Sequence, residues 1–152
     1  MKRSDSGIIE PRVRGVALYS LPRFADARGV LTVADVGAQI PFAIERTFLV
    51  YDVPSPEVRG EHAHRTLHQF LVCVHGSCLV LVDDGNERQE FRLDVPTLGL
   101  YIPPMVWSIQ YRHSRDAMML VLASAPYDPA DYIRDYETFQ ELTSGNGRDM
   151  SG

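Results

Sequence analysis

The chain has 152 residues and a formal net charge of −5, and 45% of its residues are hydrophobic. This acidic balance argues against binding to nucleic acid or to an anionic membrane, because both require a basic protein surface. The apolar run Phe70–Val82 is interrupted by His75 and Gly76 and is too short to span a bilayer, so we expect one cytoplasmic domain with no membrane contact.

In chain order, Met1–Gly7 carries cations but lacks the apolar run that a secretory signal needs. We expect residues 1–12 to form a flexible tail, residues 13–143 to form the folded domain, and residues 144–152, which are rich in Gly and Ser, to form a second flexible tail. Cys73 and Cys78 both lie in apolar runs, so we expect buried thiols rather than a disulfide.

Between the tails, short runs of Val, Ile, Leu, Phe and Tyr alternate with turn signals at intervals of about 8–12 residues, which is typical of a β-sandwich or β-barrel. The segment Asp83–Glu87, "DDGNE", predicts a hairpin turn, and Pro103 and Pro104 divide one long run into two strands. The expected strands are Gly15–Ser20, Val30–Val36, Arg46–Val53, Gln69–Val74, Cys78–Asp83, Arg88–Asp94, Leu98–Ile102, Val106–Tyr111 and Ala117–Ala123.

The segment after the last strand has a helical pattern. Asp128 stands at an N-cap position, Pro129 at the first helical position and Asp131 close to the positive end of the helix dipole. An apolar face then repeats at helical spacing, through Tyr132, Tyr136 and Phe139. The sequence therefore predicts an all-β jelly-roll barrel with a single C-terminal α-helix, at about Pro129–Leu142.

The segment Arg59–Gln69, "RGEHAHRTLHQ", contains three histidines, His62, His64 and His68. Residues i and i+2 of a strand face the same side, so His62 and His64 share one face if this segment is a strand. His68 shares that face only if the strand stays regular beyond His64. We expect His68 to be a weaker, structural member of the group.

Two functional interpretations of the histidines are open, beside a purely structural one. A metal site of the cupin type has the pattern "HxHxxxxE" and a later histidine, but Gln69 stands where the carboxylate is needed and Pro103–Tyr111 contains no histidine. Two imidazoles alone make a poor site for a divalent metal, so we expect no metal. Proton transfer needs less, because imidazole titrates near neutral pH.

Three stretches resemble the sugar-nucleotide 3,4-ketoisomerases, small dimeric cupins that act on dTDP-4-keto-6-deoxyglucose. They are "YDVPSPEVRGEHAHRTLHQFLVCVHGSCLVLVDDG", "GLYIPPMVW" and "LVLASAPYDPADYIRDYETF", and the resemblance covers about Leu18–Phe139. It implies a metal-independent and cofactor-free isomerase of deoxysugar biosynthesis that moves the ketone of the dTDP-linked sugar from C4 to C3 through an enediol or enediolate. It also implies a homodimer, which we expect to pair through a strand in Gly15–Phe24.

By the same resemblance, the catalytic pair is His62 and His64. The residues implied for substrate binding are Arg28, Arg46, Tyr51, Arg59, Gln69, Trp107 and Ser108. From the residues alone, Arg46 and Arg59 are equally interpretable as surface charges and Trp107 as a core aromatic.

Several points stay open at this level. The position of Ser108 holds a larger polar residue, histidine or arginine, in the family, whereas Arg28 resembles the pattern that gives a galacto product, so the stereochemistry at C4 is undecided. The sequence also does not say which histidine acts on carbon. The alternatives are a cupin 3,5-epimerase of the same substrate, a metal-dependent dioxygenase and a sugar-nucleotide-binding cupin without catalysis.

Overall fold

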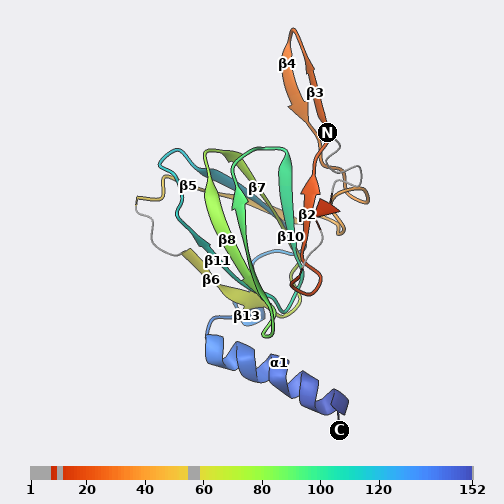
Figure 1. Cartoon of the computed structure of the whole chain (residues 1–152), viewed down its shortest axis with the longest axis vertical. Helices are drawn as coiled ribbons and strands as arrows, with labels where there is room; N and C mark the ends of the chain where they lie inside the picture. The colour runs from red at the N-terminus through yellow and green to blue at the C-terminus, as the bar shows by residue number, and fades with distance from the viewer. Residues whose placement is uncertain (1–7, 10–11, 55–58, 152) are drawn as a thin grey trace.

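The computed structural model describes residues 8–9, 12–54 and 59–151, with the side chains of residues 8–9, 59–60 and 145–151 outside the described part (Figure 1). The strands are β1 (Ile8–Ile9), β2 (Ala17–Ser20), β3 (Arg23–Asp26), β4 (Gly29–Thr32), β5 (Arg46–Tyr51), β6 (Arg59–His64), β7 (Gln69–His75), β8 (Cys78–Asp83), β9 (Arg88–Leu93), β10 (Leu98–Ile102), β11 (Trp107–Tyr111), β12 (Met118–Ala123) and β13 (Tyr132–Ile133). The helices are a 3-10 turn, η1 (Pro129–Asp131), and α1 (Tyr136–Ser151).

Two antiparallel sheets face each other and form the barrel. One has the strand order β1-β2-β10-β7-β12-β5, and the other has the order β13-β6-β11-β8-β9. Their inward side chains make one apolar core, which includes Val16, Leu71, Val80, Leu100 and Met119. The expected all-β jelly-roll barrel with one C-terminal α-helix is confirmed for the described residues, none of whose helices has the length and apolar character of a membrane span.

Burial alternates along the central strand β8, which forms where the sequence predicts it. In β8, Cys78, Val80 and Val82 are buried, while Leu79 and Leu81 between them are half-buried. This is the period of two that a strand with one buried face requires. Strands β8 and β10 occupy the predicted ranges, and the others that were predicted in the barrel differ by a few residues at their ends.

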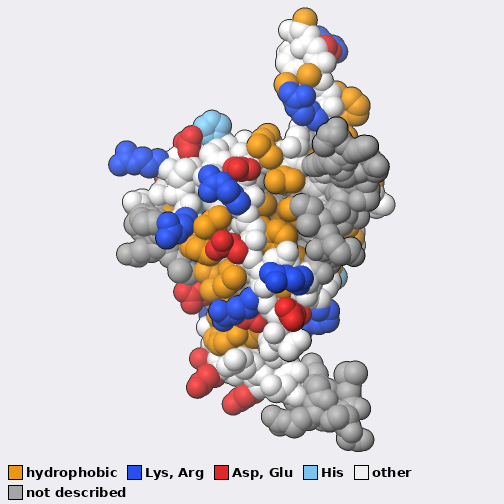
Figure 2. Space-filling model, in the orientation of Figure 1, with side chains coloured by type: hydrophobic (Ala, Val, Ile, Leu, Met, Phe, Trp, Pro, Cys, Tyr) orange, Lys and Arg blue, Asp and Glu red, His pale blue; other side chains and the backbone are white. Residues whose placement is uncertain are grey.

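A hairpin of β3 and β4 stands apart from both sheets (Figure 1). The sequence predicts one strand over Val30–Val36, but the structure pairs Gly29–Thr32 with Arg23–Asp26 in a separate two-stranded sheet. Its apolar side chains Phe24, Val30 and Leu31 are 59%, 59% and 60% exposed. Figure 2 shows hydrophobic side chains on this projecting hairpin, which pairs with no other described strand. Exposed apolar groups of this kind favour association with a partner.

The predicted helix Pro129–Leu142 is wrong in its first part. The chain forms the turn η1, then pairs Tyr132 and Ile133 of β13 with His64 and Ala63 of β6, and only then enters α1. Asp135 caps this later helix, because its carboxylate accepts hydrogen bonds from the backbone and side chain of Thr138. Helix α1 continues to Ser151, past the expected end at Leu142. The expected flexible tails, residues 1–12 and 144–152, stay predictions, and residues 1–7 and 10–11 lie outside the described part.

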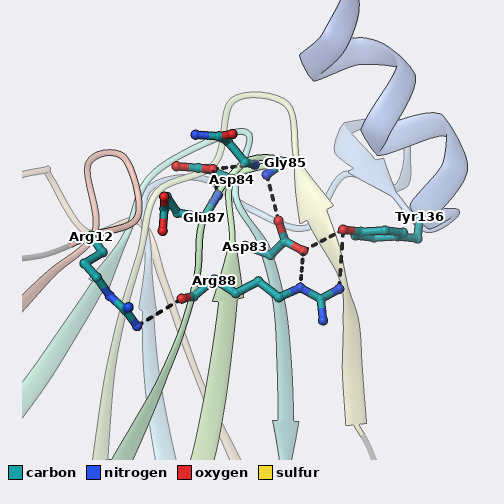
Figure 3. Close-up of polar contacts among 8 residues, drawn as sticks. Arg12, Asp83, Asp84, Gly85, Glu87, Arg88 and Tyr136 are labelled. Atoms are coloured by element: carbon teal, nitrogen blue, oxygen red, sulfur yellow. Dashed lines mark hydrogen bonds and ion pairs between the residues drawn. The ribbon is translucent and has the colours of Figure 1, made fainter.

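A polar cluster fixes the start of α1 to the end of the barrel (Figure 3). The buried carboxylate of Asp83, 2% exposed, accepts hydrogen bonds from Arg88 Nε at 2.9 Å, the Tyr136 hydroxyl at 2.6 Å and the backbone of Gly85 at 2.7 Å. A buried carboxylate is stable only with such partners. The cluster holds α1 over the end of the five-stranded sheet, next to the turn that carries β13.

Candidate active site

Strand β6 brings the two histidines of the "HAH" motif together. Its neighbour β11 pairs Ser108 with His62, and β13 pairs Tyr132 with His64, so β6 is held on both sides. The imidazole rings of His62 and His64 lie on one face with centroids 4.7 Å apart and their planes at 85°. The shared face expected for residues two apart in a strand is therefore present.

Tyr132 and Arg134 also belong to this site, and the sequence interpretation misses both. The Tyr132 ring lies against both imidazoles, with its centroid 4.9 Å from that of His62 and 4.4 Å from that of His64. The guanidinium of Arg134 lies over the Tyr132 ring at 4.1 Å, a cation–π arrangement. The signal for both residues is the motif "DYIRDY", which the helical interpretation assigned to the face of a helix.

A carboxylate stands behind the second histidine. Asp131 Oδ2 lies 3.4 Å from His64 Nδ1, and the side chains of these two residues are 13% and 5% exposed. Asp131 belongs to the turn η1, immediately before Tyr132, and not to an α-helix. The site therefore brings together two imidazoles, a phenol, a guanidinium and a carboxylate, and each of these groups contacts at least one other.

Both histidines are held in the neutral form. Burial, the charge of His64 and the charge of Arg134 lower the pKa of His62 from 6.5 to about 4. Burial also lowers the pKa of His64, and the charge and hydrogen bond of Asp131 oppose this change. At neutral pH each ring therefore has an unprotonated nitrogen that is able to accept a proton.

The lowered pKa of His62 predicts that the free energy of unfolding decreases in acid. Between about pH 6.5 and pH 4 the unfolded chain binds a proton at His62 that the folded chain does not, so the free energy of unfolding falls as the pH falls through this window. From about pH 7.5 to about pH 5 the loss due to His62 is about 2 kcal/mol. Urea unfolding at both pH values checks this. The variant His62→Asn should lose about 2 kcal/mol less than the wild type, and an equal loss in both proteins contradicts the assignment.

A cavity of about 370 Å³ opens beside His62. Its lining combines apolar and polar groups, namely Arg46, Phe48, Leu49, Val50, His62, Gln69, Ser108, Gln110, Tyr132 and Arg134. A smaller cavity of about 60 Å³ lies beside His64 and shares Arg46 and Tyr132 with the first. The larger volume is in the range of small-molecule sites, and two of its lining residues carry guanidinium groups.

The structure brings four of the sequence-predicted residues to these cavities in addition to His64. His62, Arg46, Gln69 and Ser108 line the larger cavity, and His64 lines the smaller one. His68 lines neither of these two cavities. Its Nδ1 instead makes a 2.7 Å hydrogen bond with the Tyr101 hydroxyl.

Other predicted residues lie elsewhere in the single chain. Trp107 is buried under α1, against the rings of Tyr136 and Phe139, so it is a core aromatic here and lines neither cavity. Tyr51 is exposed on the face of β5 opposite Arg46. Arg59 begins β6, but its side chain lies outside the described part.

Arg28 is the most distant of the predicted substrate-binding residues. It lies in the turn of the β3–β4 hairpin, where its side chain is 90% exposed and makes a 2.7 Å ion pair with Asp26. The single chain therefore leaves this guanidinium outside both cavities. Among the residues that the structure describes, no group of three or more His, Cys, Asp or Glu side chains is arranged to hold a metal ion.

The comparisons with known proteins agree on one family. Residues 14–144 match the family described as FdtA: WxcM-like, C-terminal. The TDP-4-oxo-6-deoxy-alpha-D-glucose-3,4-oxoisomerase of Aneurinibacillus thermoaerophilus is 46% identical to this chain over 124 residues, which are 82% of this chain and 89% of that protein.

The fold is also similar to solved structures of the QdtA 3,4-ketoisomerase from Thermoanaerobacterium thermosaccharolyticum. A double mutant of that enzyme in complex with TDP has a TM-score of 0.84 and 36% identity, with 88% of this chain and 97% of the other covered. A second mutant, in complex with TDP-4-keto-6-deoxyglucose, has a TM-score of 0.83 and 34% identity, with 88% and 96% covered.

Proposed function

We propose, because this chain belongs to the FdtA family of cupin-fold sugar-nucleotide 3,4-ketoisomerases, that it converts dTDP-4-keto-6-deoxyglucose into the corresponding 3-keto sugar. The observation that carries this proposal is the 46% identity to a 3,4-oxoisomerase over most of both chains. The neutral histidine pair beside a cavity supports it, because the reaction needs groups that accept and return protons.

The chemistry that we propose is proton transfer through an enediolate. The ketone at C4 acidifies the hydrogen on C3, and a neutral imidazole removes it as a proton. The electrons of the C3–H bond form a C3–C4 double bond, and the negative charge moves to the oxygen on C4. Transfer of a proton from the C3 hydroxyl to the C4 oxygen and protonation of C4 then leave the ketone at C3. His62 and His64 serve these steps together.

We propose that the guanidinium groups of the larger cavity bind the negative charges of substrate and intermediate. Arg134 is associated with both histidines through Tyr132, so it is placed to stabilise the enediolate oxygen. Arg46, whose guanidinium lies over Phe48 at 4.7 Å, is suited to the diphosphate, since an arginine fork matches phosphate oxygens. Gln69 and Ser108 supply neutral hydrogen-bonding groups to the sugar.

The direct test is incubation of the protein with dTDP-4-keto-6-deoxyglucose, followed by ¹³C NMR of the carbonyl position. We expect the ketone signal to move from C4 to C3. A ketone that stays at C4 together with inversion at C3 or C5 would instead assign the chain to the epimerases. Binding of the sugar nucleotide without turnover would assign it to a binding role.

We propose that the chain acts as a homodimer in the cytoplasm, with the β3–β4 hairpin packed on the partner. The hairpin carries three exposed apolar side chains, and β5, an edge strand among the described residues, presents exposed Leu49 and Tyr51. Edge strands and exposed apolar surface both favour association. This arrangement accounts for Arg28 at the hairpin turn as a substrate-binding residue that acts in the partner's site.

The dimer proposal predicts that charges on the hairpin separate the subunits. Burial of an apolar side chain contributes about 1.5–3 kcal/mol, so Val30→Asp combined with Leu31→Lys should raise the dissociation constant of the dimer by about 100-fold or more. Sedimentation velocity over a concentration series measures this. The matched control is Val95→Asp, at an exposed valine outside the hairpin, which should stay dimeric. An unchanged dimer in the hairpin variant contradicts the proposal.

A further inference from the structure

The carboxylate of Asp131 is fixed more firmly than an ordinary surface carboxylate. It accepts hydrogen bonds from Thr66 backbone N at 2.9 Å, Thr66 Oγ1 at 2.8 Å and Leu67 backbone N at 3.2 Å. Its own backbone oxygen accepts a hydrogen bond from Arg65 N at 2.9 Å. These contacts tie η1 to the turn that directly follows His64, so the carboxylate has a defined position behind that imidazole.

The contact of this carboxylate with His64 has the features of a resting catalytic pair. The separation of Asp131 Oδ2 and His64 Nδ1 is 3.4 Å, which is slightly longer than an ordinary hydrogen bond. Neither ring nitrogen of His64 has another hydrogen-bond partner among the described residues, although both are buried. Such contacts are often long in the absence of substrate and shorten when it binds.

We propose that Asp131 is the positioning residue of His64: its carboxylate accepts the Nδ1 hydrogen, so that Nε2 is the nitrogen that exchanges protons with the substrate. This inference rests on the proposed function and deepens it. Without an acceptor at Nδ1, a neutral imidazole is free to place its hydrogen on Nε2, and that tautomer does not accept a proton from the sugar.

The surrounding charges explain why a carboxylate is needed at this position. The groups that face His64 are His62 of β6, Tyr132 of β13, Arg134 after β13 and Arg46 of β5. Burial and the charges of Arg134 and Arg46 lower the pKa of His64, whereas Asp131 raises it. Asp131 therefore offsets the two guanidinium groups, so that the imidazole is able to hold a proton during turnover.

The test compares Asp131→Asn with the wild type and with Asp135→Asn as matched control. Asp135 is also a carboxylate of this segment, but it caps α1, and asparagine is an equally good cap. Nitrogen-15 NMR of histidine-labelled protein, without substrate, gives the tautomer and titration of His64. A parallel assay gives kcat and KM for ketone migration across pH.

We expect wild-type His64 to carry its hydrogen on Nδ1 and Asp131→Asn to carry it on Nε2 with a lower pKa. We expect kcat to fall by about 100-fold in this variant and to stay within about twofold of wild type in Asp135→Asn. An Nε2–H tautomer in the wild type overturns the inference even if Asp131→Asn fails to fold, and so does an unchanged tautomer in a folded Asp131→Asn. If the wild type itself does not move the ketone, the proposed function fails, while the NMR result still decides the role of Asp131.

Discussion

Replacement of His62 or His64 by asparagine should lower kcat for ketone migration by about 10³-fold or more. Positioned acid–base groups contribute about 10²–10⁴-fold each, and in the proposed mechanism the two imidazoles act on adjacent atoms of one substrate. Asparagine keeps a polar side chain of similar size but takes up no proton near neutral pH. The affinity for TDP should stay within a few-fold of wild type, because the proposed diphosphate contacts come from arginine.

The assay follows ketone migration at saturating substrate, with TDP binding measured by calorimetry on the same preparations. The matched control is His75→Asn, the same change at an exposed histidine at the end of β7, which should keep full activity. If both site variants turn over as fast as the wild type, the histidine pair is not the catalytic group. If either variant loses TDP binding in parallel with turnover, its histidine serves binding and not proton transfer.

Replacement of Arg134 by leucine should lower kcat by about 10²-fold, the scale for loss of one group that stabilises a developing oxyanion. The same replacement at Arg46 should act mainly on KM, raising it about tenfold, because contacts to the diphosphate are equal in ground and transition states. The split follows from the proposed roles, since the Arg134 guanidinium lies over the Tyr132 ring that contacts both histidines, whereas Arg46 is assigned to the diphosphate.

Steady-state kinetics on both variants measure this split, with Arg115→Leu, in the exposed turn before β12, as the matched control. Loss of Arg134 also removes a charge that lowers the pKa of His62, so NMR titration should show a higher value in Arg134→Leu. A rise in KM alone for Arg134→Leu would assign Arg134 to ground-state binding. An equal loss of kcat in both variants would show that the two arginines act as one group.

The barrel itself could be predicted from sequence because its signals are local. The apolar run of β8, which ends at the predicted turn Asp83–Glu87, and the proline pair after β10 set boundaries that the structure confirms. The β3–β4 hairpin could not be predicted in its place, because its apolar residues suggest a buried strand, whereas the single chain leaves them exposed.

Only part of the site could be predicted, because only part of it comes from one local stretch of sequence. His62 and His64 come from one short motif on one strand, so their shared face follows from the period of a strand. Asp131, Tyr132 and Arg134 reach the site because Tyr132–Ile133 pairs with β6, a long-range contact that overrides the local helical pattern. Trp107 lies next to Ser108, yet it faces α1 on the opposite side of β11. Sequence proximity to a site residue does not fix the direction of a side chain in a strand.

The most direct measurement is conversion of dTDP-4-keto-6-deoxyglucose in D2O, with deuterium located by NMR. The proposed enediolate pathway predicts a product with its ketone at C3 and deuterium at C4, delivered by a histidine that exchanges with solvent. The configuration at C4 in the same spectrum decides between the gluco and galacto products. Deuterium at C3 and C5, with the ketone still at C4, would contradict the account and identify an epimerase.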